Sequence, residues 1–161
     1  MALDKKRIIV YFQPMSIFNY FSYSLLAAVI IQILCQLSKL FYYSLKDRSF
    51  KISYFFSAGG MPSSHTAFVT ALTTSIALRN GLNSELFAIA FVFSGVIIYD
   101  AYRLRGTVQI HSRILQELKK MVPGMENREI PQMVGHTMPE IIAGLILGVI
   151  FAAGVYFVMG R

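Results

Sequence analysis

The chain has 161 residues, of which 55% are hydrophobic and 14% are charged, and its mean hydropathy is +0.56. Soluble domains typically contain about 45–50% apolar and about 25% charged residues. A single soluble domain of this length could not bury so much apolar surface in one core, so the composition argues against a soluble enzyme and a disordered chain. The one cysteine, Cys35, excludes an intrachain disulfide scaffold. We therefore expect a small integral membrane protein.

The charge balance is strongly basic, with 15 Lys and Arg against 8 Asp and Glu and a net charge of +7. Such a surplus is also typical of nucleic-acid-binding proteins. Against this apolar background it favours basic loops that face anionic lipids or a phosphate-bearing substrate. We therefore expect membrane lipids as partners and no nucleic acid.

The N-terminal part of the chain contains an interfacial segment and the first span. Residues 1–20 begin with basic residues, and the apolar stretch that follows is broken by Pro14. No small-residue cleavage site follows it, so we expect a segment lying in the membrane interface rather than a removed signal peptide. The first span is predicted over residues 21–45, because roughly 20 apolar residues cross the hydrocarbon core. Lys39 falls near its end.

Two shorter spans follow a basic link. The second is predicted over residues 64–78 and the third over residues 84–99, where the apolar run ends at Asp100. Both are short for full spans, so tilt or a locally thinned bilayer is expected.

The polar link at residues 101–138 separates the third span from the last. Within it, apolar residues recur at helical spacing over 108–121, which predicts an amphipathic helix on the membrane surface. The last span is predicted over residues 139–159, and its glycines allow close helix packing. These glycines are Gly144, Gly148 and Gly154. The expected fold is an all-α integral membrane protein, a bundle of about four transmembrane helices plus an interfacial amphipathic helix, in a single domain over residues 1–161.

Basic residues suggest how the chain is oriented in the membrane. The links at 46–63 and 101–138 share one side and hold nine Lys and Arg, against five on the other side. The positive-inside tendency therefore predicts that these links face the cytoplasm of a bacterial-type plasma membrane.

The first motif, at residues 59–65, reads GGMPSSH immediately before the second predicted span. Its glycines permit close backbone approach, and Ser63 or Ser64 can cap the helix. A helix N-terminus presents free N–H groups and a positive dipole end, which suits phosphate. His65 can donate a proton to a leaving oxygen. The alternative is an ordinary turn and N-cap with an interfacial histidine.

The second motif, at residues 135–140, reads GHTMPE at the head of the last span. His136 and Glu140 are four residues apart, hence on one face if the helix begins at or before His136. A carboxylate there can hold the imidazole in one tautomer, as a nucleophilic or basic histidine requires. The alternative is a polar helix entry without a functional role. An ionisable pair at a membrane boundary favours the functional interpretation.

Further basic residues are candidates for the same pocket. The third span closes on YDAYRLR at residues 99–105, where arginine suits bidentate phosphate binding and Asp100 could neutralise it. Lys39 and Arg48 are further candidates, with interfacial anchoring as the alternative. Because successive spans alternate in direction, we expect all these regions at one face of the membrane.

Two other chemistries are disfavoured by spacing. A zinc ion shared by His65, His136 and Glu140 would lack a compact His-Glu-x-x-His pattern, so neither metal nor cofactor is expected. A serine hydrolase that combines Ser63 or Ser64 with His136 would lack a nucleophile elbow.

The segments GGMPSSHTAFVTAL, YDAYRLR and GHTMPEIIAG resemble the divergent branch of the type 2 phosphatidic acid phosphatases, which are related to vanadium-dependent haloperoxidases. The similarity spans roughly residues 39–148. The superfamily's Pro-Ser-Gly-His block carries the general-acid histidine; here Ser64 replaces the glycine before His65. Its nucleophilic histidine precedes an aspartate by four positions; here Glu140 replaces that aspartate after His136.

Other positions depart further from the superfamily pattern. Its arginine lies shortly before the nucleophilic histidine, whereas Arg105 lies far from His136 in the sequence. Its lysine and Arg-Pro block is matched only loosely by Lys39 and Arg48, since no proline follows Arg48.

The resemblance implies metal-independent hydrolysis of a lipid phosphate through a phosphohistidine on His136, with Glu140 orienting it and His65 as the acid. The phosphate-binding residues that it implies are Arg105, Ser63, Ser64, Lys39 and Arg48, with Asp100 and Gly60 in support. A phospholipid-synthesis intermediate such as phosphatidylglycerophosphate or phosphatidate is the expected substrate. A polyprenyl pyrophosphate and a non-catalytic lipid-binding scaffold are the alternatives, and a homodimer is left open.

Overall fold

The computed structural model describes residues 22–56, 59–122 and 135–159, which form helices and turns without a strand. The elements in chain order are α1 (Tyr23–Lys46), η2 (Ile52–Phe56), α2 (Ser64–Asn80), α3 (Glu85–Tyr99), η3 (Asp100–Leu104), α4 (Arg105–Met121) and α5 (Met138–Met159). The predicted all-α class is confirmed. The interfacial segment predicted for residues 1–20 lies outside the described residues.

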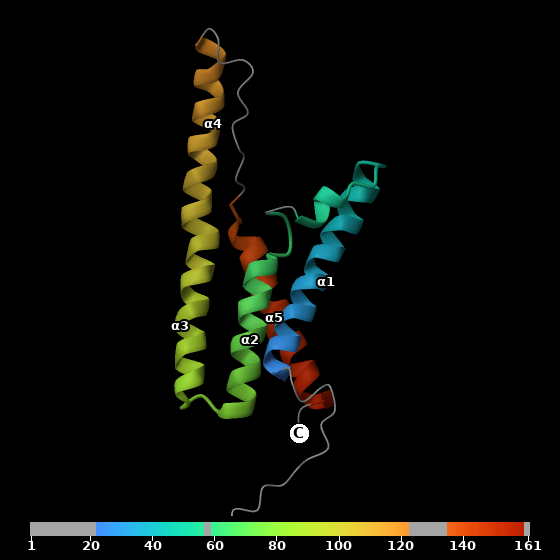
Figure 1. Cartoon of the computed structure of the whole chain (residues 1–161), viewed down its shortest axis with the longest axis vertical. Helices are drawn as coiled ribbons and strands as arrows, with labels where there is room; N and C mark the ends of the chain where they lie inside the picture. The colour runs from blue at the N-terminus through green and yellow to red at the C-terminus, as the bar shows by residue number, and fades with distance from the viewer. Residues whose placement is uncertain (1–21, 57–58, 123–134, 160–161) are drawn as a thin grey trace, which may run out of the picture.

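The helices of the bundle alternate in direction, as the spans predicted (Figure 1). The C-terminal ends of α1 and α3 lie beside the N-terminal ends of α2 and α5, at the upper end in this view. We call this the site end. All candidate regions named from the sequence therefore meet at one end of the bundle.

Helix α2 is the centre of the bundle. It packs against α1, α3 and α5, whereas α3 makes no extended contact with α1 or α5 among the described residues. A Cβ on Gly144 would lie 2.6 Å from the Ser63 carbonyl oxygen, and one on Gly148 would lie 2.8 Å from that of Ala67. Close packing through these two glycines is thus confirmed, while a Cβ on Gly154 would meet nothing within 4 Å.

Hydroxyl groups attach α3 to α2. The Oγ1 of Thr73 and the Oγ of Ser94 lie 2.7 Å apart, and Ser94 donates to the Val69 carbonyl at 3.2 Å. Thr73 donates to the Ala90 carbonyl, also at 3.2 Å. In an apolar bilayer such groups are stable only when they are satisfied inside the protein, so this network fixes the contact of the two helices.

Three helices are long and apolar enough to cross a membrane: Tyr23–Lys46, the continuous helix Glu85–Met121, and Met138–Met159. Helix α2 has only 17 residues and lies among them. At the site end, Tyr42 and Tyr99 are exposed, as tyrosines at the headgroup level of a bilayer are.

The sequence predicted that the third span ends at Asp100 and that a separate helix starts near residue 108. Instead, the π turn η3 joins α3 to α4 without a break. No proline or glycine interrupts residues 100–105, so the helix continues through these polar residues as a wider π turn and does not end there. Its 37 residues measure roughly 55 Å at 1.5 Å per residue, so α4 extends well past the hydrocarbon core, along the direction of α3 (Figure 1).

Candidate functional site

His136 and Glu140 form a close pair at the start of α5. The distance from His136 Nδ1 to Glu140 Oε2 is 2.8 Å, and the His136 side chain is 1% exposed against 18% for Glu140. The same carboxylate oxygen accepts the backbone N–H of Thr137 at 3.2 Å. Glu140 therefore both binds the histidine and caps the entry of its own helix. The pairing was expected if the helix began at or before His136, but α5 begins at Met138, so the pair forms across the helix start.

This hydrogen bond fixes the protonation pattern of the His136 ring. An ionised carboxylate only accepts hydrogen bonds, so Nδ1 carries the proton and Nε2 keeps its lone pair. Burial lowers the pKa of His136 below its ordinary value of 6.5, and the hydrogen bond that it donates to Glu140 opposes that shift. The charges of Lys39 and Arg105 also act to lower this pKa. The ring is therefore neutral near pH 7, with Nε2 available as a nucleophile.

His65 lies beside this pair, in the first turn of α2. The centroids of the His65 and His136 rings are 6.1 Å apart, with 61° between the ring planes. His65 Nδ1 is buried and has no hydrogen-bond partner in the part of the chain that the structure describes. Two imidazoles from distant parts of the sequence thus border one small polar region at the site end.

The backbone before α5 is docked directly on the π turn. The His136 N–H donates to the Ala101 carbonyl at 3.1 Å, and the Gly135 N–H donates to Gln109 Oε1 at 3.2 Å. A Cβ on Gly135 would lie 2.6 Å from the nitrogen of Gly106. The contact therefore requires glycine at position 135, and it places His136 next to the start of α4.

Arg105 reaches this region through the π turn. Its Nε lies 3.2 Å from Asp100 Oδ2, with 27% of the arginine side chain and 33% of the aspartate side chain exposed. In a regular α-helix, side chains five residues apart point about 140° away from each other. The wider π turn brings the two onto one side, so Asp100 holds Arg105 through Nε and leaves its two Nη groups outside that bond.

Ser63 and Ser64 use their side chains within the fold. Ser63 caps α2, since its Oγ accepts from the Thr66 N–H at 3.4 Å and from the Thr66 hydroxyl at 3.0 Å. Ser64 Oγ accepts from Gln36 Nε2 at 3.1 Å, which ties α2 to α1. Both serines are buried. The Ser63 N–H donates to the Glu140 carbonyl at 3.0 Å, so of the two residues Ser64 is left to offer a backbone N–H to an anion.

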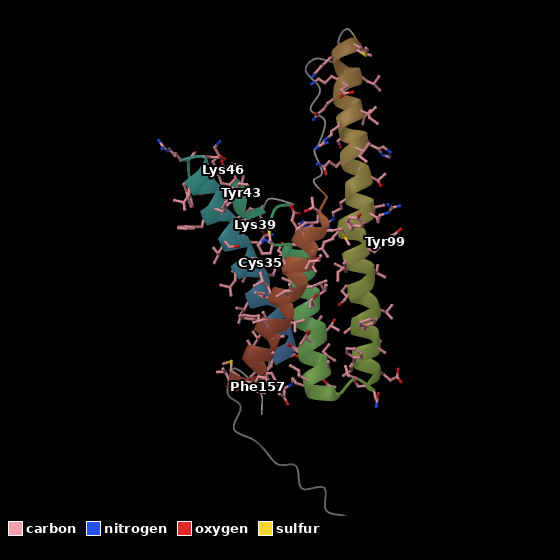
Figure 2. The ribbon with its side chains drawn as sticks, turned by 180° about the vertical axis from the view of Figure 1, so that it is seen from behind. Cys35, Lys39, Tyr43, Lys46, Tyr99 and Phe157 are labelled. Atoms are coloured by element: carbon pink, nitrogen blue, oxygen red, sulfur yellow. The ribbon has the colours of Figure 1, made fainter. Side chains whose placement is uncertain are left out.

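Lys39 is a buried cation of α1. It is 1% exposed, and its Nζ has no hydrogen-bond partner among the described residues. Figure 2 shows Cys35, Lys39, Tyr43 and Lys46 following one another along α1 toward the site end. The charge of Lys39 acts on Glu140, His65 and His136. An isolated buried ammonium group is costly, so an anion between these residues would stabilise it.

The contacts of Gly60 and Arg48 differ from those expected of residues in a phosphate pocket. Gly60 has a φ of 78°, and a Cβ there would lie 2.7 Å from the Tyr43 hydroxyl, so its place is explained by packing of the loop on α1. Arg48 is exposed, in the turn after α1, with a φ of 48°. None of the contacts within residues 22–56, 59–122 and 135–159 connects its side chain with the histidines.

Several residues of the site were not found from the sequence. Ala101, Gly106 and Gln109 position His136, and Gln36 holds Ser64. Gln36 could have been found from the sequence, because a polar residue inside an apolar run often marks a functional position. Contacts made through the backbone leave no such mark in the residue types. Among the described residues, no three His, Cys, Asp or Glu side chains come together as metal ligands would.

Comparison with known proteins agrees with this arrangement. A family model described as the Divergent PAP2 family matches residues 21–151. The chain is 28% identical over 143 residues to YuiD of Bacillus subtilis (strain 168), described as an uncharacterized membrane protein. That alignment covers 80% of this chain and 90% of YuiD. No solved structure matches the chain. Because the family match covers residues 21–151, well over half of the chain, this integral membrane protein belongs to the Divergent PAP2 family.

Proposed function

We propose that the protein is a membrane-bound phosphatase that hydrolyses a lipid phosphate through a phosphohistidine on His136, without a metal. The observation that carries this proposal is the His136–Glu140 pair, 2.8 Å apart, with the ring of His65 6.1 Å from that of His136. One histidine has its Nε2 free for attack, and the other lies close enough to act on the leaving group.

Phosphate binding in this proposal uses the two cations that border the histidines. The Nζ of Lys39 is buried without a partner, and Arg105 has its Nη groups outside the Asp100 bond. The backbone N–H groups of Ser64 and His65, at the positive end of α2, add further donors. Donors aimed at developing charge are typically worth about 3–4 kcal/mol each in transition-state stabilisation.

The reaction proceeds in two displacements. First, His136 Nε2 attacks phosphorus as the bond from phosphorus to the ester oxygen breaks, and protonated His65 gives its proton to the leaving alkoxide. The lipid alcohol departs and the phosphoryl group stays on His136. Then neutral His65 takes a proton from water as the water oxygen attacks phosphorus. The P–N bond breaks, inorganic phosphate leaves, and both histidines return to their starting states.

A lipid headgroup substrate is supported by the position of the site. The histidines lie at the end of the bundle where exposed Tyr42 and Tyr99 occur, and residues of this kind gather at the headgroup level. We expect a phospholipid-synthesis intermediate such as phosphatidate or phosphatidylglycerophosphate. The basic links place this end on the cytoplasmic side of the plasma membrane in the proposal.

The test is phosphate release by purified protein over a panel of phosphatidate, phosphatidylglycerophosphate and polyprenyl pyrophosphate. We expect His136→Ala and His65→Ala to abolish release, and His111→Ala, an exposed histidine of α4, to leave it unchanged. Near-native turnover by His136→Ala would overturn the proposed nucleophile. If no lipid is hydrolysed and vanadate does not bind, the protein is a scaffold that kept the fold.

A further inference from the structure

A second feature lies below the site, inside the membrane-spanning part of the bundle. A cavity of about 470 Å³ is bordered by α2, α3 and α5, with Thr70 and Ala77 of α2, Phe91, Gly95 and Ile98 of α3, and Leu145 of α5 among its lining residues. It exists because the glycines of α5 draw that helix onto α2, while α3 packs on α2 and makes no extended contact with α5 within the described ranges. The space between α3 and α5 is therefore not closed by direct helix packing.

The walls of this cavity are mostly carbon, and among the described lining residues the Oγ1 of Thr70 is a buried polar atom without a hydrogen-bond partner. The hydroxyls of Thr73 and Ser94 lie 2.7 Å apart, and each lies 3.2 Å from a backbone carbonyl oxygen, so their two protons are shared among contacts within the protein. Gly95 adds open space, since a Cβ there would meet nothing within 4 Å. Such a surface suits an apolar ligand that fills volume without needing hydrogen bonds.

The cavity begins below the level of the two histidines, and on α3 its lining reaches Ile98, three residues before Ala101, whose carbonyl accepts the His136 N–H. Thr70 follows His65 on α2 by roughly 7.5 Å, and Leu145 follows Glu140 on α5 by the same rise, at 1.5 Å per residue. On α3, the lining runs from Phe87 to Ile98, a length of roughly 16 Å. That is about half of the roughly 30 Å hydrocarbon core, hence about the depth of one leaflet.

We propose that this cavity binds one hydrocarbon chain of the lipid whose phosphate lies between Lys39, His65 and His136. The inference rests on the proposed function for the identity of the headgroup. An acyl chain and an isoprenoid chain share the required chemistry, and both belong to lipids already in the bilayer. The chain enters sideways between α3 and α5, so the lipid reaches the site without leaving the membrane.

The activity test fills the cavity at Gly95. We expect Gly95→Phe, and the milder Gly95→Leu, to lower kcat/KM for long-chain phosphatidate at least tenfold while hydrolysis of glycerol 3-phosphate is unchanged. The matched control is Gly154→Phe, because a Cβ at Gly154 also meets open space but Gly154 does not line this cavity. Equal effects on both substrates in a variant that retains its melting temperature, or no effect on either, would overturn the proposal.

A second test does not depend on turnover. Phosphatidate with a photoactivatable diazirine in the middle of one acyl chain is cross-linked to purified His136→Ala protein, and the labelled residues are mapped by mass spectrometry. We expect labels on Phe91, Ile98 and Leu145 that excess phosphatidate removes and that Gly95→Phe prevents. Removal by polyprenyl phosphate and not by phosphatidate would assign an isoprenoid chain.

Other labelling patterns separate the two proposals. Labels confined to exposed residues outside the cavity, such as Ile89 and Val96, would overturn the chain-binding cavity. Specific labels in the cavity without phosphate release from any lipid by the wild-type protein would refute the phosphatase and leave the lipid-binding cavity standing.

Discussion

The backbone N–H of His136 donates a hydrogen bond of 3.1 Å to the carbonyl of Ala101. This bond joins the start of α5 to the π turn between α3 and α4, two regions that are far apart in the sequence. It holds the proposed nucleophile against the turn that also places Asp100 beside Arg105. The position of the imidazole is therefore set by backbone contacts as well as by its carboxylate partner.

The first prediction concerns Gly135, whose added Cβ would lie 2.6 Å from the Gly106 nitrogen. Gly135→Ala should push His136 away from the π turn and lower kcat by about 10²-fold, because misplacement of about 1 Å costs that much. Phosphate release is the measurement. Gly106→Ala is the control, since its own Cβ would meet nothing within 4 Å. Equal activity of the two variants would contradict the docking argument.

The second prediction concerns the carboxylate that orients His136. Glu140→Gln keeps the shape but can present an N–H to Nδ1, which favours the wrong tautomer, so kcat should fall by about 10²- to 10⁴-fold. Glu140→Asp should recover part of the loss. The comparison variant is Glu117→Gln on the exposed side of α4. Full activity in Glu140→Gln would show that Glu140 only caps the helix.

The third prediction is the pH dependence of the reaction. Burial lowers the pKa of His136 below 6.5 and only its neutral form attacks, so activity is lost as the pH falls through that pKa. The first step also requires protonated His65, so the profile is bell-shaped and activity is lost again as His65 deprotonates at higher pH. The acid limb of kcat/KM should therefore lie below pH 6.5. Because the Glu140 hydrogen bond raises this pKa, Glu140→Gln should move the acid limb to still lower pH. An acid limb above 6.5 in the wild type would contradict the assignment of His136.

The fourth prediction concerns the buried ammonium of Lys39. A buried charge without a partner is costly, and an apolar side chain of similar length does not carry that cost. Lys39→Met should therefore melt at or above the wild-type temperature without ligand. Vanadate should raise the melting temperature of the wild type and of Lys46→Met, an exposed control at the end of α1, much more than that of Lys39→Met. A full vanadate effect in Lys39→Met would remove Lys39 from the phosphate site.

The fifth prediction tests the contact between α2 and α5. A Cβ on Gly144 would lie 2.6 Å from the Ser63 carbonyl oxygen, which is backbone and cannot swing away. Gly144→Ala should therefore cost about 1–3 kcal/mol of stability through overpacking. Gly154→Ala, in open space, should cost little. Thermal unfolding in detergent distinguishes the two, and similar melting temperatures would argue against tight packing at Gly144.

Much of the architecture follows from the sequence by itself. Apolar run lengths predicted α1, α2, α3 and α5 to within a few residues, because hydrophobic length and helix-stop signals act locally. Alternating directions then placed the candidate motifs at one end. The proximity of His136 and Glu140 was also expected from their spacing, although α5 begins only at Met138, so the contact spans the helix start and not one helical turn.

The tertiary structure decided the contacts that depend on backbone shape and on neighbouring helices. Arg105 meets the site because a π turn, invisible in the residue pattern, rotates it toward Asp100. The side chain of Ser64 is occupied by Gln36 of another helix. Lys39 becomes an unpaired buried charge only once α1 packs on α2. Local signals set where helices begin and end, whereas helix packing sets which polar atoms are left facing the site.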